Sequence, residues 1–278
     1  MKGSTRVLLL AATLLLVAGP AQAQASPEGH TIQVNGIEMY YETSGEGEPL
    51  VLLHSGTQTV RMWDPFVERF SSSYRLIVAD LRGHGGSTNP TGDWTTRQFA
   101  RDVFALLDQL GIERFKGIGA SAGAMTLLHM ATQQPERVEA MVVVGVGTYL
   151  PVECRQTLAG TSLDGYPEAV WERLRARHRH GDDQIRALYA WVASLATSYN
   201  DMTFTPAYLA TIKASTLVVH GDRDYCFPAW MAWEIYDAIP RAYLWVVPNG
   251  THVPLGGATG PQFAEAAMQF LDGAWEGD

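Results

Sequence analysis

Short apolar runs alternate with amphipathic stretches along most of this chain. The apolar runs have the length of buried strands and are bounded by turn residues. They cover residues 31–41, 50–54, 74–80, 115–118, 138–146, 216–220 and 243–247, and the first contains an Asn-Gly pair that predicts a hairpin. Apolar residues recur at helical spacing in residues 63–70, 95–110, 124–130 and 261–275. Strands that alternate with helices in this way predict a parallel sheet covered by helices on both faces.

The alternation stops between residues 151 and 213. No strand pattern occurs there, whereas helical patterns cover residues 168–178 and 183–197. We therefore expect a helical cap, residues 151–213, over a core in two parts, residues 24–150 and 214–278. The apolar side chains of the cap either pack it onto the core or line a pocket beneath it. These side chains are Trp171, Leu174, Ile185, Leu188, Tyr189, Val192 and Leu195.

The first 23 residues have the organisation of a signal peptide. Lys2 and Arg6 precede an apolar run at residues 7–19, and small residues follow, with cleavage expected after Ala23 or Ala25. The apolar run is shorter than the roughly 20 residues that span a bilayer. We therefore expect a periplasmic or secreted protein with no stable membrane anchor after cleavage.

The chain is acidic, with a formal net charge of −9, and loss of Lys2 and Arg6 with the signal peptide makes it −11. A negative surface repels nucleic acid and anionic membranes. We therefore expect neither as a partner and expect a small-molecule substrate instead. The oligomeric state is not predicted from the sequence.

A Gly-x-Ser-x-Gly motif at residues 119–123 is the most informative feature for function. A predicted strand leads into it and a helical pattern leads out. Glycines let the backbone turn sharply from strand to helix, which leaves the Ser121 hydroxyl exposed at the turn with a helix N-terminus behind it. The motif alone is short, but this strand and helix around it indicate a nucleophilic serine.

Acidic residues and a histidine follow later strands. The apolar run at 216–220 leads to Asp222 and Asp224, and the run at 243–247 leads to His252. Ser, Asp and His thus follow one another in the chain order of a hydrolytic triad. All of them lie just beyond the C-terminal ends of predicted strands, where open parallel sheets place their sites.

With these features the chain resembles the α/β-hydrolase superfamily, and within it the group of lidded esterases, enol-lactonases and meta-cleavage-product hydrolases. The resemblance covers nearly all of the mature chain except the cap. It rests on residues 52–56, 80–87, 119–123, 221–224 and 250–252. It implies an α/β fold with a mostly parallel eight-stranded sheet, helices on both faces and a helical cap insertion. The segment at 80–87 is expected to support the site rather than to perform chemistry.

The resemblance also implies a role for each member of the triad. Ser121 is the nucleophile, His252 the base that takes its proton, and Asp224 the residue that orients and stabilises the imidazolium. Asp222 competes for the acid role, and Asp224 is preferred because it matches the family pattern.

The oxyanion hole is expected to use the backbone N–H groups of Ala122 and Gly56. Ser55 stands where the family usually has glycine, so the geometry of this loop stays open.

The resemblance makes the strands before Cys154 and Cys226 neighbours. A disulfide between these cysteines, joining the start of the cap to the loop that carries the acid, is then geometrically possible, and two unpaired cysteines are the alternative. His178 and His180 are two residues apart and point in different directions on a helix, so we expect no metal there.

We therefore expect a serine hydrolase that cleaves an apolar carboxylic ester or lactone through an acyl-serine intermediate, without a cofactor or a metal. Serine at position 121, in the turn between strand and helix, argues against the dehalogenases and epoxide hydrolases of similar fold, because these enzymes use aspartate at that position. Two alternatives stay open. One is hydrolysis of a carbon–carbon bond in a vinylogous diketone, and the other is a receptor-like ligand-binding protein with little turnover.

Overall fold

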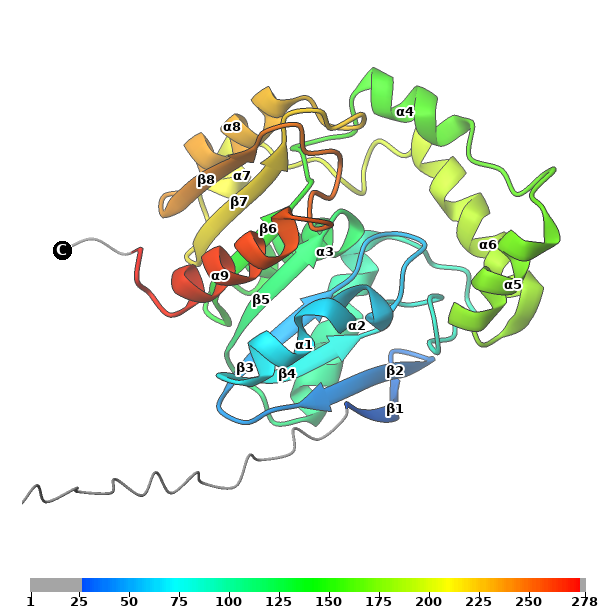
Figure 1. Cartoon of the computed structure of the whole chain (residues 1–278), viewed down its shortest axis with the longest axis horizontal. Helices are drawn as coiled ribbons and strands as arrows, with labels where there is room; N and C mark the ends of the chain where they lie inside the picture. The colour runs from blue at the N-terminus through cyan, green and yellow to red at the C-terminus, as the bar shows by residue number, and fades with distance from the viewer. Residues whose placement is uncertain (1–26, 276–278) are drawn as a thin grey trace, which may run out of the picture.

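The computed structural model describes residues 27–275, so the predicted signal peptide lies outside the described residues. One eight-stranded sheet, in the order β1-β2-β4-β3-β5-β6-β7-β8, forms the centre of the molecule (Figure 1). Its strands are β1 (Glu28–Val34), β2 (Ile37–Ser44), β3 (Glu48–Leu53), β4 (Tyr74–Ala79), β5 (Phe115–Ala120), β6 (Val138–Val144), β7 (Ser215–Gly221) and β8 (Ala242–Val247). β2 is antiparallel to β1 and to β4, and every other neighbouring pair is parallel. The predicted fold class, a mostly parallel α/β sheet, is confirmed.

The expected hairpin joins β1 and β2 at Asn35 and Gly36. Both residues have positive φ angles, 44° and 76°, as a two-residue turn that follows the twist of the strands requires. Farther along the sheet, β3 pairs with β4 on one side and with β5 on the other. The direction of winding therefore reverses between β3 and β5. A crevice forms outside the carboxyl ends of strands at such a point.

Helices cover both faces of the sheet. One face packs against η1 (Val60–Trp63), α1 (Asp64–Ser71) and α9 (Thr259–Leu271). The other packs against α2 (Thr96–Gln109), α3 (Ala122–Gln133) and α8 (Ala229–Ala238). Because both faces are buried, the central strands are almost continuously apolar. None of the helices within residues 27–275 is both long and apolar enough to cross a membrane.

The segment between β6 and β7 is helical. It contains α4 (Val152–Ala159), α5 (Glu168–Arg177), α6 (Gly181–Ser194), η2 (Leu195–Thr197) and α7 (Pro206–Leu209). In Figure 1, α4, α5 and α6 form an arm beside the sheet. We use "cap" below for residues 151–213.

The apolar stripe of the cap divides into three groups. Trp171, Leu174 and Ile185 pack with Leu163 into a small cluster inside the cap. Leu188 joins the main core. Tyr189, Val192 and Leu195 line a cavity, so both expected uses of the stripe occur.

Candidate active site

Ser121 lies at the turn between β5 and α3 with φ 50° and ψ −112°, a conformation rarely adopted by a residue with a side chain. A Cβ atom at Gly123 would overlap the carbonyl oxygen of Leu53, and one at Gly119 would overlap that of Gly123. The two glycines of the motif therefore let strand, helix and neighbouring loop meet closely. This close approach holds the strained serine in place.

The structure brings Ser121, His252 and Asp224 together. Nε2 of His252 lies 2.9 Å from Oγ of Ser121. Nδ1 of His252 lies 2.9 Å and 3.1 Å from the two carboxylate oxygens of Asp224. The histidine thus connects hydroxyl and carboxylate, which is the geometry that lets an imidazole take the hydroxyl proton.

The Asp224 carboxylate is buried, and it accepts hydrogen bonds from the backbone of its own loop as well as from His252. Its Oδ1 accepts hydrogen bonds from the backbone N–H groups of Cys226, at 2.7 Å, and Phe227, at 3.1 Å. Burial alone would raise its pKa. The hydrogen bond and charge of His252, together with these two amides, outweigh burial and hold the pKa of Asp224 below its usual value. Asp224 is therefore ionised at neutral pH and can stabilise a positively charged His252.

The competing acid, Asp222, lies elsewhere. Its side chain is 34% exposed and its charged neighbour is Arg223, 3.9 Å away. The structure thus brings Asp224, and not Asp222, to the histidine.

The loop that carries Asp224, residues 222–227, is called the acid loop below. Buried His220 supports this loop. Its Nε2 lies 2.9 Å from the carbonyl oxygen of Phe227, so a proton on this nitrogen is donated to that carbonyl. Burial lowers the pKa of His220. The sequence reasoning missed this residue, although its place at the end of the strand before the acid was a signal.

Ala122 and Gly56, the two expected oxyanion donors, both line the cavity beside Ser121. Ala122 is the first residue of α3, and Gly56 belongs to a turn in which the Gln58 N–H donates to the Ser55 carbonyl. His54 fixes this turn. Its Nε2 accepts from the Leu81 N–H at 3.0 Å, so its proton is on Nδ1, which donates to the Ser55 carbonyl at 2.8 Å.

We use "oxyanion loop" below for residues 55–58. The sequence left the backbone conformation of this loop open. Thr57 has a φ angle of 61°, in the left-handed region, and this allows the tight turn after Gly56. Ser55 therefore stands where the family usually has glycine, and the residue of this loop with a positive φ angle is Thr57, two residues later.

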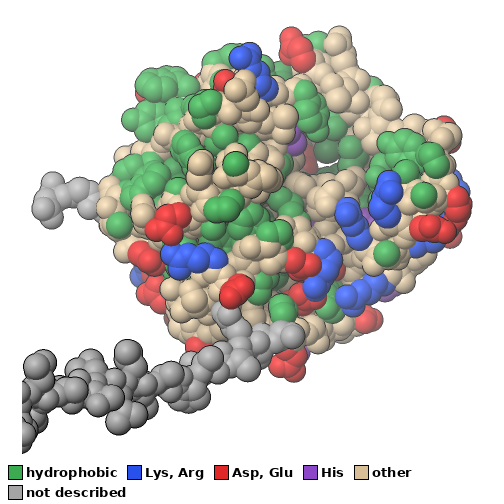
Figure 2. Space-filling model, viewed as in Figure 1, with side chains coloured by type: hydrophobic (Ala, Val, Ile, Leu, Met, Phe, Trp, Pro, Cys, Tyr) green, Lys and Arg blue, Asp and Glu red, His purple; other side chains and the backbone are tan. Residues whose placement is uncertain are grey.

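A cavity of about 350 Å³ opens onto Ser121 and His252. In Figure 2 the molecule is hollowed between the cap and the core, and hydrophobic side chains border the hollow. The cavity walls come from Met125, Leu150, Tyr189, Trp191, Val192, Leu195, Tyr225 and Phe227, and from Thr157, Leu158 and Thr161 in and after α4. Among the described residues, no Asp, Glu, Lys or Arg side chain lines it.

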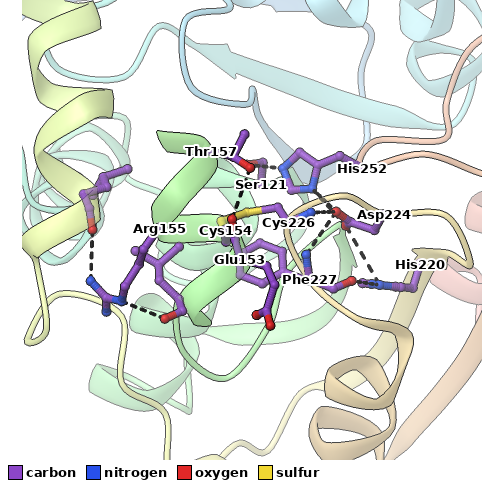
Figure 3. The surroundings of a disulfide bond; sticks show 12 residues. Ser121, Glu153, Cys154, Arg155, Thr157, His220, Asp224, Cys226, Phe227 and His252 are labelled. Atoms are coloured by element: carbon purple, nitrogen blue, oxygen red, sulfur yellow. Dashed lines mark hydrogen bonds and ion pairs between the residues drawn. A yellow bond between two sulfur atoms is a disulfide. The ribbon is translucent and has the colours of Figure 1, made fainter. Parts of the chain in front are cut away.

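The α4 wall was missed by the sequence reasoning, because residues 152–159 carry no sustained apolar pattern. A disulfide between Cys154 of α4 and Cys226 of the acid loop brings this helix to the site (Figure 3). Of the two alternatives left by the sequence, the structure therefore has the bridge.

His178 and His180 attach the cap to the core. Nδ1 of His178 accepts a hydrogen bond from the Gly85 N–H, and His180 contacts the Gly86 carbonyl. Within residues 27–275, no three His, Cys, Asp or Glu side chains are grouped as metal ligands.

The segment at residues 80–87 supports the site. The Asp80 carboxylate accepts hydrogen bonds from the N–H groups of Val60 and Gly86, at 2.7 and 2.8 Å. It thereby joins the oxyanion side of the site to the loop on which the cap docks.

Comparison with known proteins agrees with this architecture. Residues 48–167 match the family model described as alpha/beta hydrolase fold. Serine hydrolase BPHL of Homo sapiens is 28% identical over 245 residues, which are 84% of each chain. The 2-hydroxy-6-oxo-6-(2'-aminophenyl)hexa-2,4-dienoic acid hydrolase of Metapseudomonas resinovorans is 24% identical, over 86% of this chain and 89% of the relative. The crystal structure of the enol-lactonase from Burkholderia xenovorans shares the fold, with a TM-score of 0.71 and 24% identity over 87% of this chain and all of the other.

Proposed function

We propose that this chain, which has the alpha/beta hydrolase fold, is a serine hydrolase that cleaves a neutral, largely apolar carboxylic ester or lactone. The single observation that carries this proposal is an apolar cavity without charged lining side chains, which opens onto a serine, histidine and aspartate in hydrogen-bond contact. The chemistry needs no cofactor, since each step uses groups of this chain.

Acylation begins at Ser121. Its Oγ attacks the substrate carbonyl carbon while Nε2 of His252 takes the hydroxyl proton, and Asp224 stabilises the resulting imidazolium. The oxyanion of the tetrahedral intermediate accepts hydrogen bonds from the N–H groups of Ala122 and Gly56. Collapse of the intermediate breaks the ester C–O bond, and His252 gives its proton to the leaving alkoxide.

Deacylation repeats these steps with water. His252 takes a proton from a water molecule that attacks the acyl carbon, and the oxyanion forms in the same place. His252 then returns the proton to Oγ of Ser121 as the acid product leaves. In a lactone the alcohol stays attached to the acyl group, so one hydroxy acid is released.

The cavity favours a neutral substrate over the carbon–carbon alternative. The substrate in the name of one relative, the hydrolase of Metapseudomonas resinovorans, is a dienoic acid and so carries a carboxyl group. An ionised carboxylate buried without a cation or a full set of hydrogen bonds costs several kcal/mol, on the order of the whole binding energy of a weak ligand. Among the described residues that line the cavity, no Lys or Arg offers that compensation.

We also propose that the protein works in the periplasm or outside the cell. The Cys154–Cys226 disulfide supports this, because such bonds persist in oxidising compartments.

The test is nitrophenol release from a series of nitrophenyl esters and aryl lactones, with Ser121→Ala as the comparison. Sustained turnover that disappears in the variant supports the proposal. Nitrophenyl pentanoate and the nitrophenyl monoester of succinic acid, similar in length but different in charge, test the substrate class. Faster hydrolysis of the charged ester contradicts a neutral substrate, and a single burst without turnover indicates a receptor-like protein.

A further inference from the structure

We propose that the Cys154–Cys226 disulfide determines the substrate range of this enzyme by fixing α4, one wall of the cavity, against the loop that carries the catalytic acid. The inference rests on the proposed function and assigns to the two cysteines a part in specificity rather than in stability alone.

The two ends of the disulfide lie at different parts of the site. Cys226 lines the cavity, and its backbone N–H donates to Oδ1 of Asp224 at 2.7 Å. Cys154 is fully buried on α4, and Thr157 and Leu158 of the same helix line the cavity. Figure 3 shows α4 beside the acid loop, with Ser121 and His252 close by. One covalent bond therefore connects the wall that meets the substrate with the loop that orients the base.

The other strong contacts of α4 hold it to the cap and not to the acid loop. The Arg155 guanidinium donates to the carbonyl oxygens of Leu195, Ala196 and Ser198 in the cap, and to that of Leu150, the residue just before the cap. α4 also packs against α6 and η2, which belong to the cap as well. Without the disulfide, none of these contacts fixes the position of α4 relative to Asp224.

The acid loop has supports of its own. His220 contacts the Phe227 carbonyl, and the amides of Cys226 and Phe227 bind Asp224 within the loop. Loss of the disulfide should therefore leave an ordered triad but a loosened wall. This separates two effects: turnover of a small substrate that does not reach α4 changes little, whereas discrimination among larger acyl groups is lost.

The experiment compares the wild type with Cys154→Ser, which breaks the disulfide without altering a residue that lines the cavity, on nitrophenyl esters of increasing acyl length. Glu153→Gln is the matched control, since this exposed residue neighbours Cys154 on α4. We expect kcat on the acetyl ester to stay within about threefold, and the ratio of kcat/KM between the best and the longest ester to fall about tenfold, the range that a few methylene contacts supply. Circular dichroism at the assay temperature checks that both variants are folded.

A second readout does not depend on ester turnover. Alkyl fluorophosphonates of short and long chain label a nucleophilic serine, as Oγ bonds to phosphorus and fluoride leaves. The ratio of their labelling rates should move toward one in Cys154→Ser, as the ester ratio does. If Cys154→Ser does not fold, the same ratio is measured on the wild type before and after dithiothreitol, whose two thiols are oxidised as the bridge becomes two thiols.

The outcomes separate the two proposals. Equal ratios in wild type and variant, within twofold, overturn the role of the disulfide and leave the proposed function intact. Labelling without ester turnover overturns the proposed function, while the labelling ratio still tests the disulfide. A wild-type protein that neither labels nor turns over overturns both.

Discussion

Nδ1 of His178, at the end of α5, accepts a hydrogen bond from the backbone N–H of Gly85 at 3.0 Å. The next residue, Arg179, donates its own N–H to the Gly85 carbonyl at 2.9 Å. The Gln184 side chain amide adds bonds to carbonyls of the same loop. These bonds join the cap to the core. The bond to His178 requires a neutral histidine, because a protonated Nδ1 cannot accept.

Acid should destabilise the protein for this reason. Burial lowers the pKa of His178 to about 4 and that of His54 to about 4, and it also lowers the pKa of His84, His129 and His220. In the unfolded chain, histidines take up protons near pH 6.5. Between about pH 6.5 and 4 the unfolded state therefore binds more protons, and the free energy of unfolding falls as pH falls.

One group opposes this trend. Burial raises the pKa of Asp80 to about 6, so between its unfolded value near 3.9 and pH 6 the folded state binds its proton more readily. Five histidines outweigh one carboxyl. Urea unfolding at a series of pH values measures the slope, which His178→Gln should reduce. Stability that stays flat or rises as pH falls from 6.5 to 4 contradicts the expectation.

The two aspartates of the acid loop should behave differently. Asp224→Asn removes the charge beside His252 and allows the wrong tautomer, so we expect kcat to fall by roughly 10³ to 10⁴. Asp222→Asn, two residues away along the chain but not in contact with His252, should keep kcat within about threefold. Steady-state kinetics on one nitrophenyl ester measures both. Comparable losses in the two variants would contradict the assignment of the acid.

The strands, and the positions of Ser121, Asp224 and His252 beside one another, could be predicted from the sequence because their signals are local. Apolar runs mark strands that are buried on both faces, and Ser121, Asp224 and His252 stand directly after such runs. Once strand ends share one edge of a sheet, residues that follow them meet without any further information. The fold and these three positions therefore follow from short stretches of chain.

The parts that could not be predicted depend on contacts between distant segments. The polar sequence of α4 gives no sign that Thr157 reaches the site, since its place depends on a bond between residues 154 and 226. Similarly, the sequence gives no partner for His178, because Gly85, whose N–H it accepts, lies 93 positions earlier. The local pattern of apolar and polar residues does not indicate contacts between residues so far apart in the chain.

A methyl group at Gly123 should be far more harmful than one at Gly160. At Gly123 the Cβ would overlap the backbone carbonyl of Leu53, which cannot move without displacing β3 and the oxyanion loop. At Gly160 the nearest atom is 3.5 Å away and φ is −81°. We expect Gly123→Ala to cost about 1 to 3 kcal/mol or more of unfolding free energy, and Gly160→Ala to be neutral or slightly stabilising.

Urea unfolding measures the free energy of unfolding of both variants. The rate at which a fluorophosphonate labels Ser121 reports whether the turn between β5 and α3 keeps its conformation. A Gly123→Ala protein with wild-type stability and labelling rate would show that the close approach of helix and loop is not needed.

The buried ion pair between Arg82 and Asp102 should stabilise the core rather than take part in the chemistry. Nε and Nη2 of Arg82 donate to the two carboxylate oxygens at 2.6 and 2.8 Å, and both side chains are almost fully buried. Removal of one partner leaves a buried charge, so Asp102→Asn or Arg82→Met should each cost about 3 to 5 kcal/mol. The double variant should lose less than the sum, because no charge is left unpaired. Arg101→Met, on the exposed side of α2, is the control.

Neither ion-pair partner lines the cavity, so variants that remain folded should keep KM within about twofold. A large change in KM without loss of stability would instead mean that this pair helps to shape the site.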